Sequence, residues 1–218
     1  ITNIRGLALR TGFGLLGLTM WFLSIIYLDI SLATALSQTM PIFITGLSVL
    51  IAGEKVGLKR SASVFVGFLG VVVLIFPLTP TVNLLGVFYA LLGAFFSALM
   101  FVYLRVLGRT DPAVTTAIWY NSTGVVLAGI IALSFDGFDA IQQLSSLTPL
   151  YLLIALGVCA SFQQFFLAQS HMYAQASMLA PLHFLAIPLG IGIGITFFNE
   201  NITLKFLMGT AIIIASTY

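Results

Sequence analysis

Two long stretches without any charged side chain constrain the fold of this chain more than any other feature. Residues 61–104 and 140–199 contain no Asp, Glu, Lys or Arg. Uncharged apolar runs of roughly 18 residues or more are typical of transmembrane helices. Across the 218 residues, 60% are hydrophobic and 6% are charged, whereas soluble domains carry about 25% charged residues. The sequence therefore predicts an all-α, polytopic membrane helix bundle, because a membrane barrel would show short alternating strands.

Turn and capping residues divide the chain into eight predicted helices. Asp111-Pro112 and Thr148-Pro149 each place a capping side chain before a proline at the first position of a helix. The predicted helices cover residues 11–28, 31–53, 61–77, 84–105, 113–134, 148–168, 174–197 and 203–218.

The basic residues lie almost entirely on one side of these predicted helices. When successive loops are assigned to alternate sides, Lys205 is the one basic residue on the second side. Cytoplasmic loops of membrane proteins carry such an excess of Lys and Arg. The first side is therefore predicted to be cytoplasmic, and the C-terminus lies there. The basic residues of this side are Arg5, Arg10, Lys55, Lys59, Arg60, Arg105 and Arg109.

A short repeat relates the two halves of the chain. The segments EKVGLK and ENITLK, which begin at Glu54 and Glu200, share the pattern Glu-x-x-x-Leu-Lys. Each glutamate follows a predicted helix with an internal proline, and these two helices are five helices apart. An odd offset means that the two units cross the membrane in opposite directions, as in the inverted repeats of many secondary transporters.

A five-helix repeat divides the chain unequally. The last five predicted helices form one complete unit, whereas the first unit shows only three helices. We therefore expect a partial first repeat at residues 1–80 and a complete second repeat at residues 81–218. Two helices are then missing at the N-terminus, and the lack of an initial Met agrees with this expectation. The chain is interpreted as a fragment or truncated version of a ten-helix protein.

A series of motifs between residues 21 and 77 is similar to a known family. An aromatic helix is followed by a Leu-Ala-x-Ala helix start, a mid-helix proline, a Gly-Glu pair and a glycine-containing helix. These features are Trp21, Tyr27, Leu32, Ala33, Ala35, Pro41, Gly53, Glu54, Gly67 and Gly70. They resemble the EamA-type members of the drug/metabolite transporter superfamily. The second half resembles the family repeat through Tyr173, Ala176, Pro181, Glu200 and Gly209, and departs from it at Asn199 and Ser216.

The resemblance carries expectations about architecture and location. It implies ten helices in two inverted five-helix repeats, with a central substrate cavity between them. Within the family, the chain is similar to bacterial members that are likened to S-adenosylmethionine uptake carriers. A bacterial inner (plasma) membrane is therefore the expected location.

One face of the second predicted helix is polar. Its residues are Thr34, Ser37, Gln38, Pro41, Thr45 and Ser48, which recur at helical spacing. Polar atoms that face lipid lose hydrogen bonds, so this face should point into the bundle. Gln38 and Thr45 are then candidate substrate contacts, although Ser and Thr residues also serve simply to pack helices together. Pro41 deprives a carbonyl one turn earlier of its donor, which either kinks the helix or leaves an atom for a ligand.

Four side chains on other helices complete the candidate substrate site. Trp21 can stack on a flat or cationic substrate, and Tyr89 belongs to a polar stripe. At least one of the adjacent Gln163 and Gln164 should point inward, and we select Gln163. His183 can titrate near neutral pH inside the membrane, which favours proton coupling or substrate contact. The alternative for these residues is packing, with a neutral His183 bonded to a backbone carbonyl.

Glu54 and Glu200 are predicted at opposite membrane faces. Each can bond backbone or basic groups at a neighbouring helix end and thereby latch a gate. Pro41 and Pro181 are assigned to the same gate or structural group. A solvated carboxylate at a helix end is the alternative for each glutamate.

Signatures of other protein classes are missing from the sequence. A Gly-rich phosphate loop, a metal-spaced His/Cys cluster and a Ser/His/Asp set are absent, so no cofactor, metal or enzymatic activity is expected. The net charge of +2 argues against nucleic acid. We expect a secondary transporter of a small polar metabolite, such as an amino acid, a nucleoside or an S-adenosylmethionine-like compound, that works by alternating access. The expected partners are this substrate and the lipid bilayer, and a homodimer is left open. A structural or assembly subunit and a membrane-embedded enzyme remain alternatives.

Overall fold

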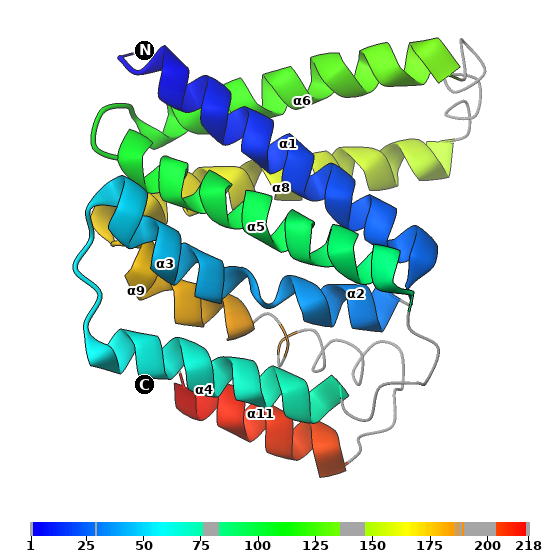
Figure 1. Ribbon diagram of the computed structural model, residues 1–218. Coiled ribbons are helices and arrows are strands. Elements are labelled where there is room, and N and C mark those ends of the chain that lie inside the picture. Colours follow the sequence, from blue (N-terminus) through cyan, green and yellow to red (C-terminus); the bar gives the residue numbers. More distant parts are fainter. Residues whose placement is uncertain are drawn as a thin grey trace.

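The computed structural model describes residues 2–28, 30–75, 83–135, 147–185, 187, 189 and 204–216, and within these ranges it contains helices and no strands (Figure 1). Among these described residues, four segments are long and apolar enough to cross a membrane: Ile4–Tyr27, Leu84–Leu107, Ala113–Ile131 and Leu150–Tyr173. They belong to α1 (Ile4–Tyr27), α5 (Leu84–Leu107), α6 (Ala113–Phe135) and α8 (Leu147–Tyr173). A helix of 20 residues already spans about 30 Å. The expected all-α membrane helix bundle is confirmed.

The first helix begins earlier than the sequence predicted. It starts at Ile4 rather than at residue 11, because the side chain of Asn3 caps it by accepting a hydrogen bond from the backbone N–H of Gly6 at 2.9 Å. The carboxylate of Asp111, expected to cap the following helix, instead accepts hydrogen bonds from the backbone N–H groups of Thr2 and Asn3. Arg10 therefore lies within a helix and not in a loop.

The second predicted helix is broken in two. The pieces are α2 (Ile30–Ser37) and α3 (Met40–Ala52), with a turn at Gln38 and Thr39 between them. The hydroxyl of Thr39 donates to the carbonyl of Leu36 at 2.8 Å and stabilises this turn. Pro41 lies in the first turn of α3, where its missing N–H costs no helical hydrogen bond. The expected kink is therefore an interruption. The helix α3 ends at Ala52, and the C-cap residue Gly53 has a left-handed φ of 64°.

The seventh predicted helix is also irregular. It begins with α9 (Ala176–Leu179) and continues as the 3₁₀ helix η2 (Ala180–Leu185), which contains the buried Pro181. Most of the rest of this predicted helix lies outside the described residues, as do Pro188 and Glu200. The interruptions in the two halves thus occur at, or directly before, a proline.

The remaining helices, α4 (Leu58–Ile75) and α11 (Leu204–Ser216), lie side by side along one edge of the bundle (Figure 1). The hydroxyl of Ser63 donates to the carbonyl of Ser216 between them. At one end of the bundle lie the start of α1, the α3–α4 and α5–α6 connections, and the end of α11 (Figure 1). These are the segments that the charge pattern grouped on one side, and the cytoplasmic orientation of this end stays a prediction.

Glycines bring α1 and α5 into close contact. A Cβ atom at Gly17 would lie 2.6 Å from the hydroxyl oxygen of Ser97 and 3.0 Å from its backbone nitrogen. A Cβ atom at Gly93 would lie 3.2 Å from the carbonyl oxygen of Gly17. Small residues allow transmembrane helices to approach in this way. This crossing holds α1 at a fixed position beside the interrupted helices.

Candidate functional site

A cavity of about 330 Å³ lies where α1, α2, α3, α5, α6 and η2 meet. Three of the predicted substrate-binding residues line it, namely Trp21, Gln38 and His183. Gln38 lies in the turn that separates α2 from α3, so the interruption of this helix places an amide side chain at the cavity. The other lining residues are Gly14, Gly17, Leu18, Ser37, Met40, Gly93, Ala94, Ser97, Met100 and Tyr120.

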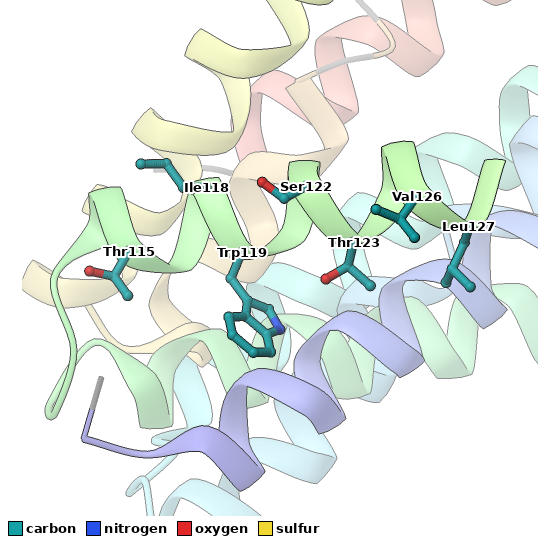
Figure 2. A pocket seen from close by; sticks show the side chains of 7 residues that line it. All are labelled: Thr115, Ile118, Trp119, Ser122, Thr123, Val126 and Leu127. Carbon is teal, nitrogen blue, oxygen red and sulfur yellow. The ribbon is translucent and has the colours of Figure 1, made fainter. Parts of the chain in front are cut away.

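Two larger hollows, of about 510 and 600 Å³, lie on the outer faces of α6 and α8. Figure 2 shows the first hollow, whose lining side chains all come from α6. Ile118 and Val126 in this hollow are 60% and 59% exposed. Apolar side chains that project from a single membrane helix are typical of a surface that packs against lipid or another helix. We therefore assign the candidate site to the smaller cavity between the helices.

The other three predicted substrate contacts lie away from this cavity. The hydroxyl of Thr45 donates to the carbonyl of Pro41 at 2.8 Å, within its own helix. The ring of Tyr89 stacks on that of Tyr27, with centroids 6.0 Å apart. Gln163 is exposed on α8, whereas the neighbouring Gln164 is half-buried and points toward α1. Their roles in substrate binding stay predictions.

His183 belongs to a stack of three rings. The ring of His183 meets that of Phe101 edge-on, with the two centroids 4.5 Å apart. The ring of His171 stacks on that of Phe101, with the two centroids 5.6 Å apart. Nδ1 of His171 lies 2.9 Å from the carbonyl oxygen of Leu167, so this nitrogen carries the proton. Nε2 of His171 is buried and lacks a hydrogen-bond partner among the described residues. Within the same residues, no group of three His, Cys, Asp or Glu side chains could hold a metal ion.

Glu54 joins the two halves of the chain at the end of the bundle that holds the α3–α4 connection. It is 4% exposed. One carboxylate oxygen accepts a hydrogen bond from the backbone N–H of Ala176 at 2.7 Å. The other accepts from the backbone N–H and the hydroxyl of Ser177, at 2.9 and 2.5 Å. Nε of Arg105 lies 3.7 Å from the carboxylate. We call Glu54, Arg105, Ala176 and Ser177 the latch.

The latch stabilises the ionised form of its carboxylate. Burial alone raises the pKa of Glu54, but the hydrogen bonds from the hydroxyl and amide of Ser177 and from the amide of Ala176 outweigh it. The pKa of Glu54 therefore lies below its ordinary value. The negative charge also faces the N-terminal end of α9, where the backbone N–H groups favour an anion.

Arg105 of the latch and two further arginines, Arg60 and Arg109, bond to other elements around it. Arg60 donates to the side chains of Gln175 and Ser177. Nη1 of Arg105 donates to the carbonyl oxygens of His171 and Met172, at 2.8 and 3.0 Å. Arg109 donates to the carbonyl of Ala52 at 3.0 Å. The sequence indicated these arginines only as positive loop charges, because their partners lie far away along the chain.

A fourth arginine, Arg10, is fully buried beside the cavity. Its Nη2 donates to Oε1 of Gln164 at 2.6 Å. Its guanidinium carbon lies 3.9 Å from the ring centroid of Tyr120, which lines the cavity. Nε and Nη1 of Arg10 have no hydrogen-bond partner among the described residues. The sequence pattern placed Arg10 among the loop charges, so its buried position was not predicted.

Comparison with known proteins settles the family. The sequence profile of the EamA-like transporter family matches residues 3–76 and 84–218. The chain belongs to this family. An uncharacterized transporter of Helicobacter pylori (strain J99 / ATCC 700824) is 30% identical over 98% of this chain and 72% of its own length. The resemblance inferred from the motifs is thus confirmed, and this EamA-like protein is an integral membrane transporter.

Two further relatives have names that state a substrate. A riboflavin transporter of Vibrio cholerae is 28% identical over 95% of this chain and 68% of its own length. An S-adenosylmethionine uptake transporter of Rickettsia prowazekii is 27% identical over 98% of this chain and 69% of its own length. These names point to transport rather than to enzymatic activity. A solved crystal structure, 15% identical, matches 100% of this chain and 88% of its own with a TM-score of 0.74, which supports the fold.

Proposed function

We propose that this EamA-like protein is a secondary carrier that moves a small polar metabolite across a bacterial inner membrane by alternating access. The observation that carries the proposal is the cavity between the helices, lined by Trp21, Gln38 and His183. It is formed jointly by α1, α2 and α3, before residue 80, and by α5, α6 and η2, after it. Secondary transporters bind substrate at such junctions, next to interrupted helices.

The lining of the cavity favours a polar metabolite with a planar ring. Trp21, Tyr120 and His183 offer aromatic faces, and Gln38 and Ser97 offer hydrogen-bonding groups. Pockets that combine apolar rings with a few polar groups orient small ligands well. Riboflavin and S-adenosylmethionine, named for two relatives, both combine a heteroaromatic ring system with polar substituents. Nucleosides and aromatic amino acids have the same character.

The latch provides one of the two gates that alternating access requires. Glu54 precedes residue 80, whereas Arg105, Ala176 and Ser177 follow it, so the latch holds the two units together at one end. Opening this end requires the separation of a buried carboxylate from its hydrogen-bond donors. We place the cavity above a closed cytoplasmic gate in this conformation.

Uptake into proteoliposomes tests the carrier proposal. The protein is offered labelled amino acids, nucleosides, riboflavin and S-adenosylmethionine, with and without a proton gradient. We expect saturable uptake of at least one compound, and a loss of tenfold or more in Gln38→Ala, since a polar contact inside a cavity of low dielectric is worth about 1.5 kcal/mol. Thr19→Ala is the matched control, because Thr19 is exposed on α1 and bonds its own backbone. No saturable uptake of any compound would contradict the proposal.

A further inference from the structure

We propose that Arg10 binds a carboxylate group of the transported metabolite. This inference rests on the proposed function and names the substrate class: a metabolite that carries a carboxylate beside a planar, hydrogen-bonding body. The carboxylate docks on the guanidinium of Arg10, and the rest of the molecule occupies the cavity beside Trp21 and Gln38.

The position of Arg10 is unusual for a basic residue near the end of a membrane helix. Such a residue normally extends its side chain to the membrane surface, where water solvates the charge. Arg10 instead points into the bundle and is 0% exposed. It is held there by Gln164 of α8 and Tyr120 of α6, at the distances given above. A charge held inside a membrane protein is costly, and it is typical of a substrate or ion pathway.

The charge of Arg10 lacks a carboxylate partner among the described residues. Two of the six Asp and Glu residues of the chain, Glu54 and Asp111, are described, and each is engaged elsewhere. Glu54 belongs to the latch, and Asp111 accepts hydrogen bonds from Thr2, Asn3 and Thr110. The amide of Gln164 is neutral, and Nε and Nη1 of Arg10 still have no acceptor. A buried arginine with free donors is strongly unfavourable unless an anion neutralises its charge and accepts hydrogen bonds from these donors.

Tyr120 connects Arg10 to the cavity. One face of its ring lies against the guanidinium, and the residue itself lines the cavity. Gly14, one helical turn beyond Arg10, also lines the cavity, and a Cβ atom there would lie only 2.9 Å from the Tyr120 ring. The glycine therefore makes room for the tyrosine. Arg10 itself is not among the residues that line the cavity, so Tyr120 must move aside when the carboxylate binds.

The chemistry of the guanidinium selects the carboxylate. Its planar fork matches the two oxygens of a carboxylate with parallel hydrogen bonds. One carboxylate also neutralises the single positive charge, whereas a phosphate monoester would leave excess negative charge inside the membrane. Carboxylate binding thus accounts for the burial, the free donors and the nearby cavity together.

Ligand binding in detergent tests this inference independently of transport. The chain has two tryptophans, and Trp119→Phe leaves Trp21 in the cavity as the sole tryptophan, which is excited selectively over the tyrosines. The probes are matched pairs that differ by one carboxylate: S-adenosylmethionine with its decarboxylated analogue, and phenylalanine with phenethylamine. We expect at least one carboxylate to quench Trp21 saturably and to bind about 30-fold more tightly than its partner. Arg10→Gln should bring this ratio close to one and leave the affinity of the amine unchanged.

A second variant covers the case in which Arg10→Gln does not fold. Arg10→Lys keeps the positive charge but lacks the planar fork, so we expect the ratio to fall by about threefold to tenfold. A ratio that persists in both variants would overturn the inference, and so would the failure of every carboxylate to bind. If carboxylates bind through Arg10 but no compound enters proteoliposomes, the carrier proposal fails and the carboxylate site stands. If a compound is taken up but the Arg10 variants do not change the affinity ratio between a carboxylate and its partner, the carboxylate site alone is overturned.

Discussion

The carboxylate of Glu54 accepts hydrogen bonds from both the backbone N–H and the hydroxyl of Ser177, which lies 123 residues further along the chain. The two residues come from opposite sides of residue 80 and are buried together. The expected bonding of Glu54 to backbone groups at a neighbouring helix end is thus present, and its role as a gate stays a prediction.

Replacing the carboxylate should destabilise the latch. Glu54→Ala leaves the buried N–H groups of Ala176 and Ser177 and the cation of Arg105 without their partner. Loss of one partner of a buried charged network costs about 3–5 kcal/mol. We expect a lower midpoint of thermal unfolding in detergent, measured by circular dichroism. Lys55→Ala is the control, because Lys55 is exposed next to Glu54, and an equal effect of both substitutions would argue against the latch.

The latch also predicts how stability depends on pH. The pKa of Glu54 in the folded protein lies below its ordinary value of 4.5. A depressed pKa means that the ionised carboxylate stabilises the fold fully above pH 4.5, and that this contribution is lost as the pH falls through the folded pKa. We expect the unfolding midpoint of the wild-type protein to fall between pH 5 and pH 3. Asp111, whose pKa is also lowered by its hydrogen bonds against the effect of burial, contributes in the same direction.

The variants Glu54→Gln and Asp111→Asn separate the two contributions to this pH dependence. In each variant the unfolding midpoint should fall less steeply between pH 5 and pH 3, because the substituted residue no longer binds a proton in that range. If the midpoint of both variants falls with pH as steeply as that of the wild type, other groups dominate the loss of stability in acid.

The close contact of α1 with α5 predicts opposite effects for two glycines of the same helix. Gly17→Ala places a Cβ atom 3.0 Å from the backbone nitrogen of Ser97, so the helices must move apart, at a cost of about 1–3 kcal/mol. Gly12→Ala meets nothing within 4 Å and should be neutral or stabilise the protein by up to about 1 kcal/mol through helix propensity. Unfolding midpoints measured side by side check this difference. Equal unfolding midpoints of Gly17→Ala and Gly12→Ala would mean that the close contact at Gly17 does not contribute to stability.

The sequence predicted much of the fold because apolar runs report directly on membrane-spanning helices. The motifs also indicated the correct family. In the candidate site, Trp21, Gln38 and His183 come together at one cavity, as expected from an inward polar face and from aromatic and titratable residues inside the membrane. These inferences needed only the residue types and their spacing along each helix.

The remaining parts of the site depend on contacts between distant segments. Successive helical residues differ in direction by about 100°, so the sequence could not decide whether Gln163 or Gln164 points inward; Gln164 is the one that contacts Arg10. The inward direction of Arg10 depends on Tyr120, which is far away along the chain. The break at Gln38 depends on Thr39, whose side chain bonds the backbone locally, an arrangement that periodicity does not reveal.

Alternating access predicts that opening of the latch exposes Gln38 to the cytoplasm. Cys159, the one cysteine of the chain, is first replaced by Ser, and Gln38→Cys is then introduced as a reporter in the cavity. Inverted vesicles present the predicted cytoplasmic face to a thiol reagent that does not cross the membrane. We expect slow labelling while the latch is closed, and labelling at least threefold faster when Glu54→Gln is added, because the amide binds the N–H groups of Ala176 and Ser177 less strongly than a carboxylate does.

The control for this experiment is Thr34→Cys, because Thr34 is exposed on α2 and is not among the residues that line the cavity. Its labelling should not respond to Glu54→Gln. Faster labelling at both positions would indicate general unfolding rather than the opening of a gate. Unchanged labelling of Gln38→Cys in the Glu54→Gln background would contradict a gate at the latch, and Glu54 would then serve only to hold α9 in place.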